Sequence, residues 1–373
     1  MGPQLLIDKS TLQSLSYNEV MSLNIHYYVV YTPVLFIEIL GDLKKFSNSE
    51  ISKREVQKLA KKISAMDSCF TANYRILLYN DLMGNRVNMD YRPVRLGGQQ
   101  VVTKAGEKGI FFDEEQEHKA LRRWLVGQFS EAEKILSESW RRSTRALDLQ
   151  SWQKLFQSNQ TIPKARNYNE LLTMTEEFIG NQSLQLESIQ VLLSEVEFTK
   201  RDRNNIFNRW LKKEMPALKD FAPYAFYCLK VFVAFYLGIA NRLIGTKPTN
   251  RIDLEYLLYV PFCRVLSSTD KFLREFGPCF LNNNQDFVWG NDLKADLKRI
   301  SEHWRSLTDN QKCEYRDKHG CYPPERDDSI TYKLWRKYMG TPRERKPLTP
   351  EREKEIMKRI QPYIDSIKQA RRE

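Results

Sequence analysis

The 373-residue sequence predicts an α/β fold: a parallel-sheet core, interrupted by a mostly helical insertion and followed by a helical extension. Short apolar runs alternate with helix-like segments in residues 1–47 and again in residues 221–292, and this alternation predicts the core. Residues 48–220 are charged and helix-periodic, which predicts the insertion. Residues 293–373 are helical in pattern and basic, and we interpret them as a C-terminal extension.

The first core segment contains two strand–helix pairs. QLLID forms a short buried strand that ends at Asp8, followed by a polar turn and a helix through YNEVMSL. YYVVYTP is the second strand, because it is rich in β-branched and aromatic residues. It runs into Thr32 and Pro33, which suit the N-cap and first position of a helix through VLFIEILGDLKKF. Glu38 lies among apolar residues of that helix, where an acid is costly to bury unless a positive group meets it.

The predicted insertion has two stretches that depart from its helical pattern. These are YRILLYNDLMG and the glycine-containing RLGGQQVVTKAGEKGIFFDEE. The first has strand character, and the second is typical of a loop or hairpin that projects from the body.

The second core segment opens with an apolar run, residues 221–245, that is long enough to span a membrane. Lys230 interrupts this run and Ala, Tyr and Cys dilute it, so we expect a buried core helix rather than a membrane span. KPTN then breaks the chain, Asp253 begins a helix of about two turns, and Pro261 ends it. CRVLSS is the next strand, Asp270 follows its end, and KFLREFGPCFL and DFVWG add one more helix and strand.

Composition limits the class of protein and its partners. Lys and Arg outnumber Asp and Glu by 59 to 47, and the net charge of +12 favours nucleic acid before an anionic membrane surface. Six scattered cysteines without a C-x-x-C pair are typical of reduced intracellular thiols. The start, MGPQLLIDKS, fits neither a signal peptide nor a myristoylation site, so we expect a cytoplasmic protein. ATP hydrolysis is not supported, because the sequence lacks G-x-x-x-x-G-K-[ST].

Four acidic residues fall where parallel strands would bring them together. Asp8 ends the first strand, Glu38 lies in the helix after the second, Asp253 begins a helix and Asp270 follows a later strand. The carboxyl ends of parallel strands lie at one edge of a sheet, where α/β proteins bind ligands. Four carboxylates repel one another unless cations lie between them, and all-oxygen ligands favour Mg²⁺ or Mn²⁺. The sequence therefore predicts a divalent-metal site suited to phosphodiester hydrolysis.

The four segments around these acids resemble, in order, the acidic motifs of the PIN-like ribonuclease family. They are LLIDKSTL, VVYTPVLFIEIL, RIDLEYLLY and RVLSSTDKF. The resemblance covers about residues 1–45 and 223–292, and the long insertion departs from the compact core that is usual in the family. It implies a PIN-like nuclease core in which the catalytic and metal-holding residues are Asp8, Glu38, Asp253 and Asp270.

The resemblance also implies supporting residues around the acids. Ser10 and Ser268 stand where small hydroxylated residues support the carboxylates. Glu255 competes with Asp253 for the third position, because both lie in one helical turn. Lys9 directly follows Asp8 and, as a strand neighbour, would point to the other face of the sheet.

These observations together predict a metal-dependent endoribonuclease that hydrolyses RNA with Mg²⁺ or Mn²⁺, and the family resemblance implies products with 5′-phosphate and 3′-hydroxyl ends. Two alternatives stay open: a non-catalytic nucleic-acid-binding or assembly module on a PIN-like scaffold, and a structure-specific DNA nuclease. The large additions favour substrate restriction or control by a regulatory protein partner, as in a toxin-like or antiviral defence effector.

A second predicted contact with RNA lies in the insertion, in residues 118–156. Arginines alternate there with aromatic residues, a composition able to grip single-stranded RNA through phosphate contacts and base stacking. The alternative is an amphipathic helix pair whose tryptophans face inward, which we favour for the tryptophans. The candidate RNA-binding residues are Arg122, Arg123, Arg141, Arg142 and Arg145.

Overall fold

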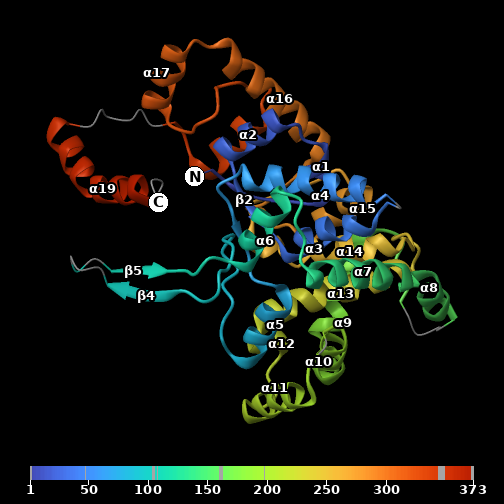
Figure 1. Ribbon diagram of the computed structural model, residues 1–373. Coiled ribbons are helices and arrows are strands. Elements are labelled where there is room, and N and C mark those ends of the chain that lie inside the picture. Colours follow the sequence, from blue (N-terminus) through green and yellow to red (C-terminus); the bar gives the residue numbers. More distant parts are fainter. Residues whose placement is uncertain are drawn as a thin grey trace.

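A computed structural model of the protein describes residues 2–46, 48–102, 106, 108–158, 163–196, 198–342 and 349–370. Its centre is a five-stranded parallel sheet with strand order β3-β2-β1-β6-β7, surrounded by helices (Figure 1). The predicted α/β fold is therefore confirmed. The strands are β1 (Gln4–Ile7), β2 (Tyr28–Tyr31), β3 (Cys69–Phe70), β6 (Val265–Ser268) and β7 (Asp286–Trp289).

The central strand, β1, joins the two core segments. Leu5 is paired with Val29 of β2 on one side and with Val265 of β6 on the other. All three strands are mostly buried, as expected for a parallel sheet covered on both faces. β3 lies within the segment predicted as a helical insertion, so that segment also supplies one edge strand of the sheet.

The helices predicted over YNEVMSL and VLFIEILGDLKKF are present, but the polar turn predicted after Asp8 is helix α1 (Lys9–Ser14), which Asp8 caps. Ser16 begins α2 with a capping box, in which its side chain and that of Glu19 accept hydrogen bonds from each other's backbone amides. Thr32 caps α3 by accepting a hydrogen bond from Leu35 N, and Pro33 takes the first helical position. The helices here are α1 (Lys9–Ser14), α2 (Tyr17–His26), α3 (Pro33–Gly41) and α4 (Ser49–Ser64).

The insertion departs from its prediction at one stretch. YRILLYNDLMG forms helix α5 (Tyr74–Met83) and not a strand, because Asn73 caps it and Gly84 ends it with a left-handed φ of 97°. The predicted hairpin is present, with β4 (Gln99–Val102) antiparallel to β5 (Lys108–Phe111), and it projects from the body (Figure 1). The remaining helices are α6 (Gln116–Leu125), α7 (Glu131–Ala146), α8 (Leu149–Ser158), α9 (Tyr168–Gly180), α10 (Gln185–Ser194), α11 (Lys200–Lys212) and α12 (Leu218–Phe221).

The apolar helix of the second core segment is α13 (Pro223–Ala240). Among the described residues it is the one helix long and apolar enough to cross a membrane, but 67% of this span is buried inside the protein. Phe232 and Phe235 have no exposed surface. The prediction of a buried core helix is therefore confirmed. The helices that follow are α14 (Pro248–Leu257), α15 (Lys271–Phe276) and α16 (Gly290–Ser306).

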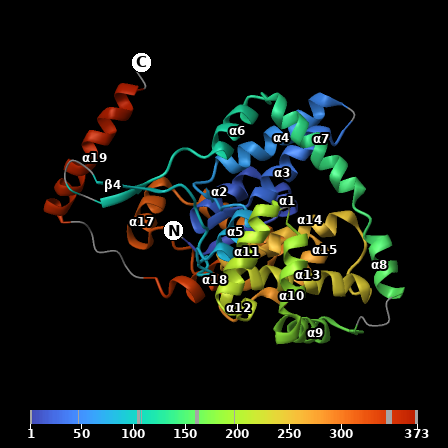
Figure 2. The ribbon, with the colours of Figure 1, turned by 90° about the horizontal axis from the view of Figure 1, so that it is seen from below.

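The C-terminal extension adds α17 (Asp309–His319), α18 (Ile330–Met339) and α19 (Pro350–Ala370). α18 returns to the N-terminal core, where Trp335 Nε1 donates a hydrogen bond to the carbonyl oxygen of His26 at 2.6 Å. By contrast, α19 stands away from the body in both views (Figures 1 and 2). All six cysteines lie in the described ranges, and each is a free thiol.

Candidate active site

Asp8 follows β1 at its carboxyl end and is almost completely buried, with 2% exposure. Its Oδ1 accepts a hydrogen bond from the Thr11 amide at 2.8 Å and thereby caps α1. Its Oδ2 accepts from the hydroxyls of Ser10 at 2.5 Å and Ser268 at 2.7 Å. Burial raises the pKa of Asp8 above its usual range, although these hydrogen bonds oppose the rise. Both serines predicted to support the carboxylates thus contact Asp8.

Asp270 joins the same network through Ser268. Ser268 ends β6, the strand beside β1, and its hydroxyl oxygen accepts a hydrogen bond from Asp270 N at 2.9 Å. Asp270 Oδ1 accepts from the amides of Phe272 at 2.7 Å and Leu273 at 3.3 Å, so it caps α15. One hydroxyl therefore links the acids that follow two neighbouring strands.

Glu38 lies in α3, and its partly buried carboxylate accepts a hydrogen bond from a tyrosine. Tyr256 of α14 donates a hydrogen bond to Glu38 Oε2 at 2.5 Å. Burial raises the pKa of Glu38 to about 7, the charge of Lys9 opposes that rise, and the charges of Asp8 and Asp42 add to it. Glu38 is thus close to its midpoint of titration at neutral pH.

Asp253 lies in the middle of α14. That helix begins at Pro248, which suits the first helical position, so the prediction that Asp253 begins the helix is wrong. Burial raises the pKa of Asp253 well above its usual range, and the charges of Glu38, Asp270 and Asp8 add to the rise. Asp253 therefore lies near the other three predicted acids.

Glu255, the competing third acid, has different neighbours. Its Oε1 lies 3.3 Å from Arg251 Nη1. Burial raises the pKa of Glu255, and the charges of Arg251 and Arg75 oppose that rise. Cations thus surround Glu255, whereas Asp253 lies near three other acids. This contrast favours Asp253 as the member of the acid group.

The fit of a metal ion depends on both the donor set and its spacing. Within the part of the chain that the structure describes, no three His, Cys, Asp or Glu side chains gather closely enough to hold a metal ion. The donors themselves suit a hard divalent cation, because all four are carboxylates and three of them add to the rise that burial causes in the pKa of Asp253. The group therefore fits Mg²⁺ or Mn²⁺ by chemistry, and its side chains would have to draw together to bind one.

The structure places Lys9 differently from the sequence prediction. It is the first residue of α1 and not a strand residue, so strand alternation does not apply to it. Its ammonium lies 2.8 Å from Asp42 Oδ1 and donates to the carbonyl oxygen of Glu38 at 3.0 Å. The positive group that Glu38 was expected to need is therefore Lys9. The signal was local: had Asp8 been taken as an N-cap, Lys9 would have been placed in the helix.

Three of the five candidate RNA-binding arginines are already paired with carboxylates. Arg122 pairs with Glu114, and Arg123 Nη2 lies 2.5 Å from Glu133 Oε1. Arg141 instead holds the end of α3, because it lies 3.1 Å from Asp42 Oδ1 and donates to the Gly41 carbonyl oxygen at 2.9 Å. The exposed members of the set are Arg122, Arg142 and Arg145.

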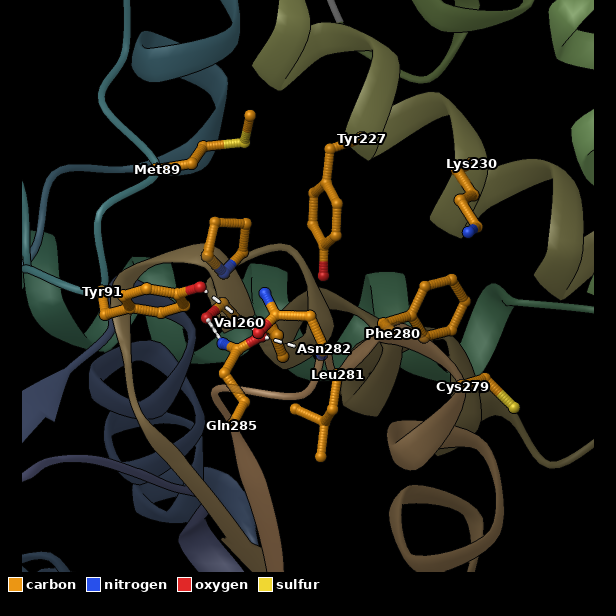
Figure 3. A pocket seen from close by; sticks show the side chains of 11 residues that line it. Met89, Tyr91, Tyr227, Lys230, Val260, Cys279, Phe280, Leu281, Asn282 and Gln285 are labelled. Atoms are coloured by element: carbon orange, nitrogen blue, oxygen red, sulfur yellow. Dashed lines mark hydrogen bonds between the residues drawn. The ribbon is translucent and has the colours of Figure 1, made fainter. Parts of the chain in front are cut away.

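A pocket of about 370 Å³ lies at the other end of the strands (Figure 3). Its lining includes Val260 before β6 and Asn282 before β7, whereas the acids follow the carboxyl ends of the strands. Its polar groups bond one another: Tyr91 donates to Asn282 Oδ1 at 3.2 Å, and Gln285 Nε2 donates to the Val260 carbonyl oxygen at 2.7 Å (Figure 3). This pocket is therefore separate from the acid group.

Comparisons with known proteins find no match for this chain among protein-family models, curated proteins or solved structures. A functional assignment therefore depends on the four acids and their surroundings.

Proposed function

We propose that the protein is a metal-dependent endoribonuclease with a PIN-like core, in which Asp8, Glu38, Asp253 and Asp270 hold Mg²⁺ or Mn²⁺. The observation that carries this proposal is the approach of four acids to one another beside the carboxyl ends of β1 and β6. Buried like charges are unfavourable without a cation, and open parallel sheets bind ligands at this edge.

Hydrogen bonds orient three of the four carboxylates. Ser268 holds Asp8 by donating its hydroxyl hydrogen, and the start of α15 holds Asp270, so both carboxylates keep fixed directions. The Tyr256 hydroxyl donates to Glu38 and orients it. A divalent ion held by this group would lower the pKa of water, which would then serve as the nucleophile.

One observation favours a second candidate, a nucleic-acid-binding module without cleavage. Among the described residues the acids do not form a group that could hold a metal ion as they stand. Binding without cleavage would follow if they never drew together. The proposal also includes a toxin-like or defence role with a regulatory partner, which partner assays test. It includes a preference for RNA over DNA as well, which substrate assays test.

The deciding experiment compares cleavage of labelled single-stranded RNA, and of matched DNA, in Mg²⁺, in Mn²⁺ and in chelator. We expect RNA cleavage that requires the metal and leaves 5′-phosphate ends. Asp253→Asn and Glu38→Gln should each lower the rate by about 100-fold or more, on the scale of losing one transition-state contact.

Glu255→Gln is the matched control, because it removes an acid from the same helix as Asp253 without touching the acid group. It should keep most of the activity if the variant remains folded. RNA that binds but stays intact in every metal would support the non-catalytic module instead, and faster cleavage of DNA would support the DNA nuclease.

A further inference from the structure

A basic hollow lies beside the end of α1 that is remote from Asp8. It has a volume of about 400 Å³ and lies between the start of α2 and the last turns of α4. We call it the lysine hollow, and its lining residues are Gln13, Tyr17, Glu55, Lys58, Leu59, Lys61 and Lys62.

Two lysines beside this hollow donate hydrogen bonds to backbone carbonyl oxygens of α1. Lys62 Nζ donates to the carbonyl oxygens of Leu12 at 2.8 Å and Gln13 at 3.0 Å. Lys294 Nζ, from α16, donates to the Ser14 carbonyl oxygen at 2.6 Å. Together these ammonium groups satisfy the carbonyls at the end of α1 and complement its negative dipole end.

Two other lysines are held loosely enough to exchange partners. Lys58 is 67% exposed, and its ion pair with Glu55 at 2.6 Å is a surface pair of little energetic value. Lys61 is exposed, and its ammonium lies 5.4 Å from the centre of the Tyr17 ring. Either ammonium group can therefore turn to a phosphate without uncovering a buried charge.

Tyr17 gives the hollow an aromatic face. It is the first residue of α2 and is 47% exposed, although large aromatic side chains are usually buried. An exposed ring beside lysines is the combination with which proteins stack an unpaired base and neutralise the phosphates next to it.

One short helix, α1, connects Asp8 to the hollow. α1 spans six residues between Asp8 and the hollow, a length of about 9 Å at the usual helical rise. The structure thus places the hollow one short helix away from Asp8.

We propose that the lysine hollow binds single-stranded RNA, with a base stacked on Tyr17 and phosphates at Lys58 and Lys61. This inference deepens the proposed nuclease function and rests on it for the role of the hollow. Binding itself is measured without cleavage, which keeps the two proposals separable.

The experiment measures fluorescence anisotropy of a short labelled single-stranded RNA, with chelator present, over a range of salt concentrations. Lys58→Gln/Lys61→Gln should weaken binding and make the slope of log affinity against log salt shallower by up to about 1.4, at about 0.7 for each phosphate contact. Tyr17→Ala should weaken binding about 5- to 150-fold with an unchanged slope, and Tyr17→Leu should not rescue it, whereas Tyr17→Phe should.

Arg142→Gln/Arg145→Gln tests the competing RNA contact predicted from the sequence, because it removes the same charge from two exposed arginines of α7. It should leave the slope close to that of the parent. An unchanged slope in the lysine variant, or a change only in the arginine variant, would overturn the lysine hollow as the RNA site even if RNA is cleaved in Mn²⁺. Binding at the hollow with no cleavage in any metal would instead refute the nuclease proposal alone.

Discussion

Acidification should weaken the junction between the N-terminal core and the C-terminal extension through one histidine. His26 has no exposed surface, and its Nδ1 lies 2.9 Å from the Cys321 carbonyl oxygen, so Nδ1 carries the proton of the neutral ring. Nε2 is buried and has no hydrogen-bond partner among the described residues. A second proton would add a buried charge and a buried donor there, and burial lowers the pKa of His26 to about 4.

Proton linkage converts this shift into a stability change. An unfolded histidine has a pKa near 6.5, so between pH 6.5 and about pH 4 the unfolded chain binds a proton that the folded chain rejects. The contribution of His26 to the unfolding free energy is therefore fully present above pH 6.5 and is lost as the pH falls. The folded and unfolded pKa values of His26 differ by about 2.5, which corresponds to about 3 kcal/mol of unfolding free energy. About 2 kcal/mol of this is lost between pH 8 and pH 5.

Denaturant unfolding at several pH values, on the parent and on His26→Asn, tests this prediction. The asparagine amide can occupy the place of Nδ1 and donate to Cys321, but it does not titrate. Glu38 acts with the opposite sign, because a carboxyl whose pKa is raised to about 7 loses stability as the pH rises from 4.5. Both proteins share that effect, so the difference between them isolates His26.

We expect the stability of the parent to fall relative to His26→Asn by about 2 kcal/mol between pH 8 and pH 5. His303→Asn, at a partly exposed histidine of α16, should follow the parent. Parallel pH profiles for the parent and His26→Asn would refute the reasoning from burial.

Three further predictions concern the acid group and its support. Ser268→Ala should lower the cleavage rate about 10- to 100-fold, because its hydroxyl donates to the Asp8 carboxylate and accepts from the Asp270 amide; kcat at saturating metal measures this. Asp253→Asn should raise the unfolding free energy at pH 8 in chelator by on the order of 1 kcal/mol, since it removes a repelled charge, and equal or lower stability would contradict that. Arg141→Gln should cost about 1–3 kcal/mol in urea unfolding, because buried Asp42 loses a partner, whereas Arg142→Gln should be close to neutral.

The elements that the sequence predicted correctly carry their signals locally. β2 and α3 are an example: a run of β-branched and aromatic residues passes into Thr32 and Pro33, and both features act within a few residues. The start of α14 was predicted at Asp253, because an acid suits a helix N-terminus. Proline suits the first helical position as well, and the helix begins at Pro248. α5 was misread because its apolar residues are too dense to show a helical period in one short run.

The sequence pointed to the four acids of the candidate site, but it did not reveal the residues that contact them. The order of strands and acids along the chain predicted that Asp8 and Asp270 lie at one edge of a single sheet, and the strands that precede them, β1 and β6, are neighbours. The hydrogen bond from Tyr256 to Glu38 joins residues 218 positions apart, and the bond from Lys9 to the Glu38 carbonyl spans 29. Neither contact has a local pattern, because each depends on how separate elements pack.

The hydrogen bond from Ser268 to Asp8, between residues 260 positions apart, has a consequence during biosynthesis. At roughly 5–20 residues per second, a ribosome needs tens of seconds after making Asp8 before it makes β6. Until then β1 lacks one neighbour, and Asp270 has not been made. A chain terminated before residue 253 would carry only Asp8 and Glu38 of the group, so under the proposed function such a product would be unable to cleave RNA.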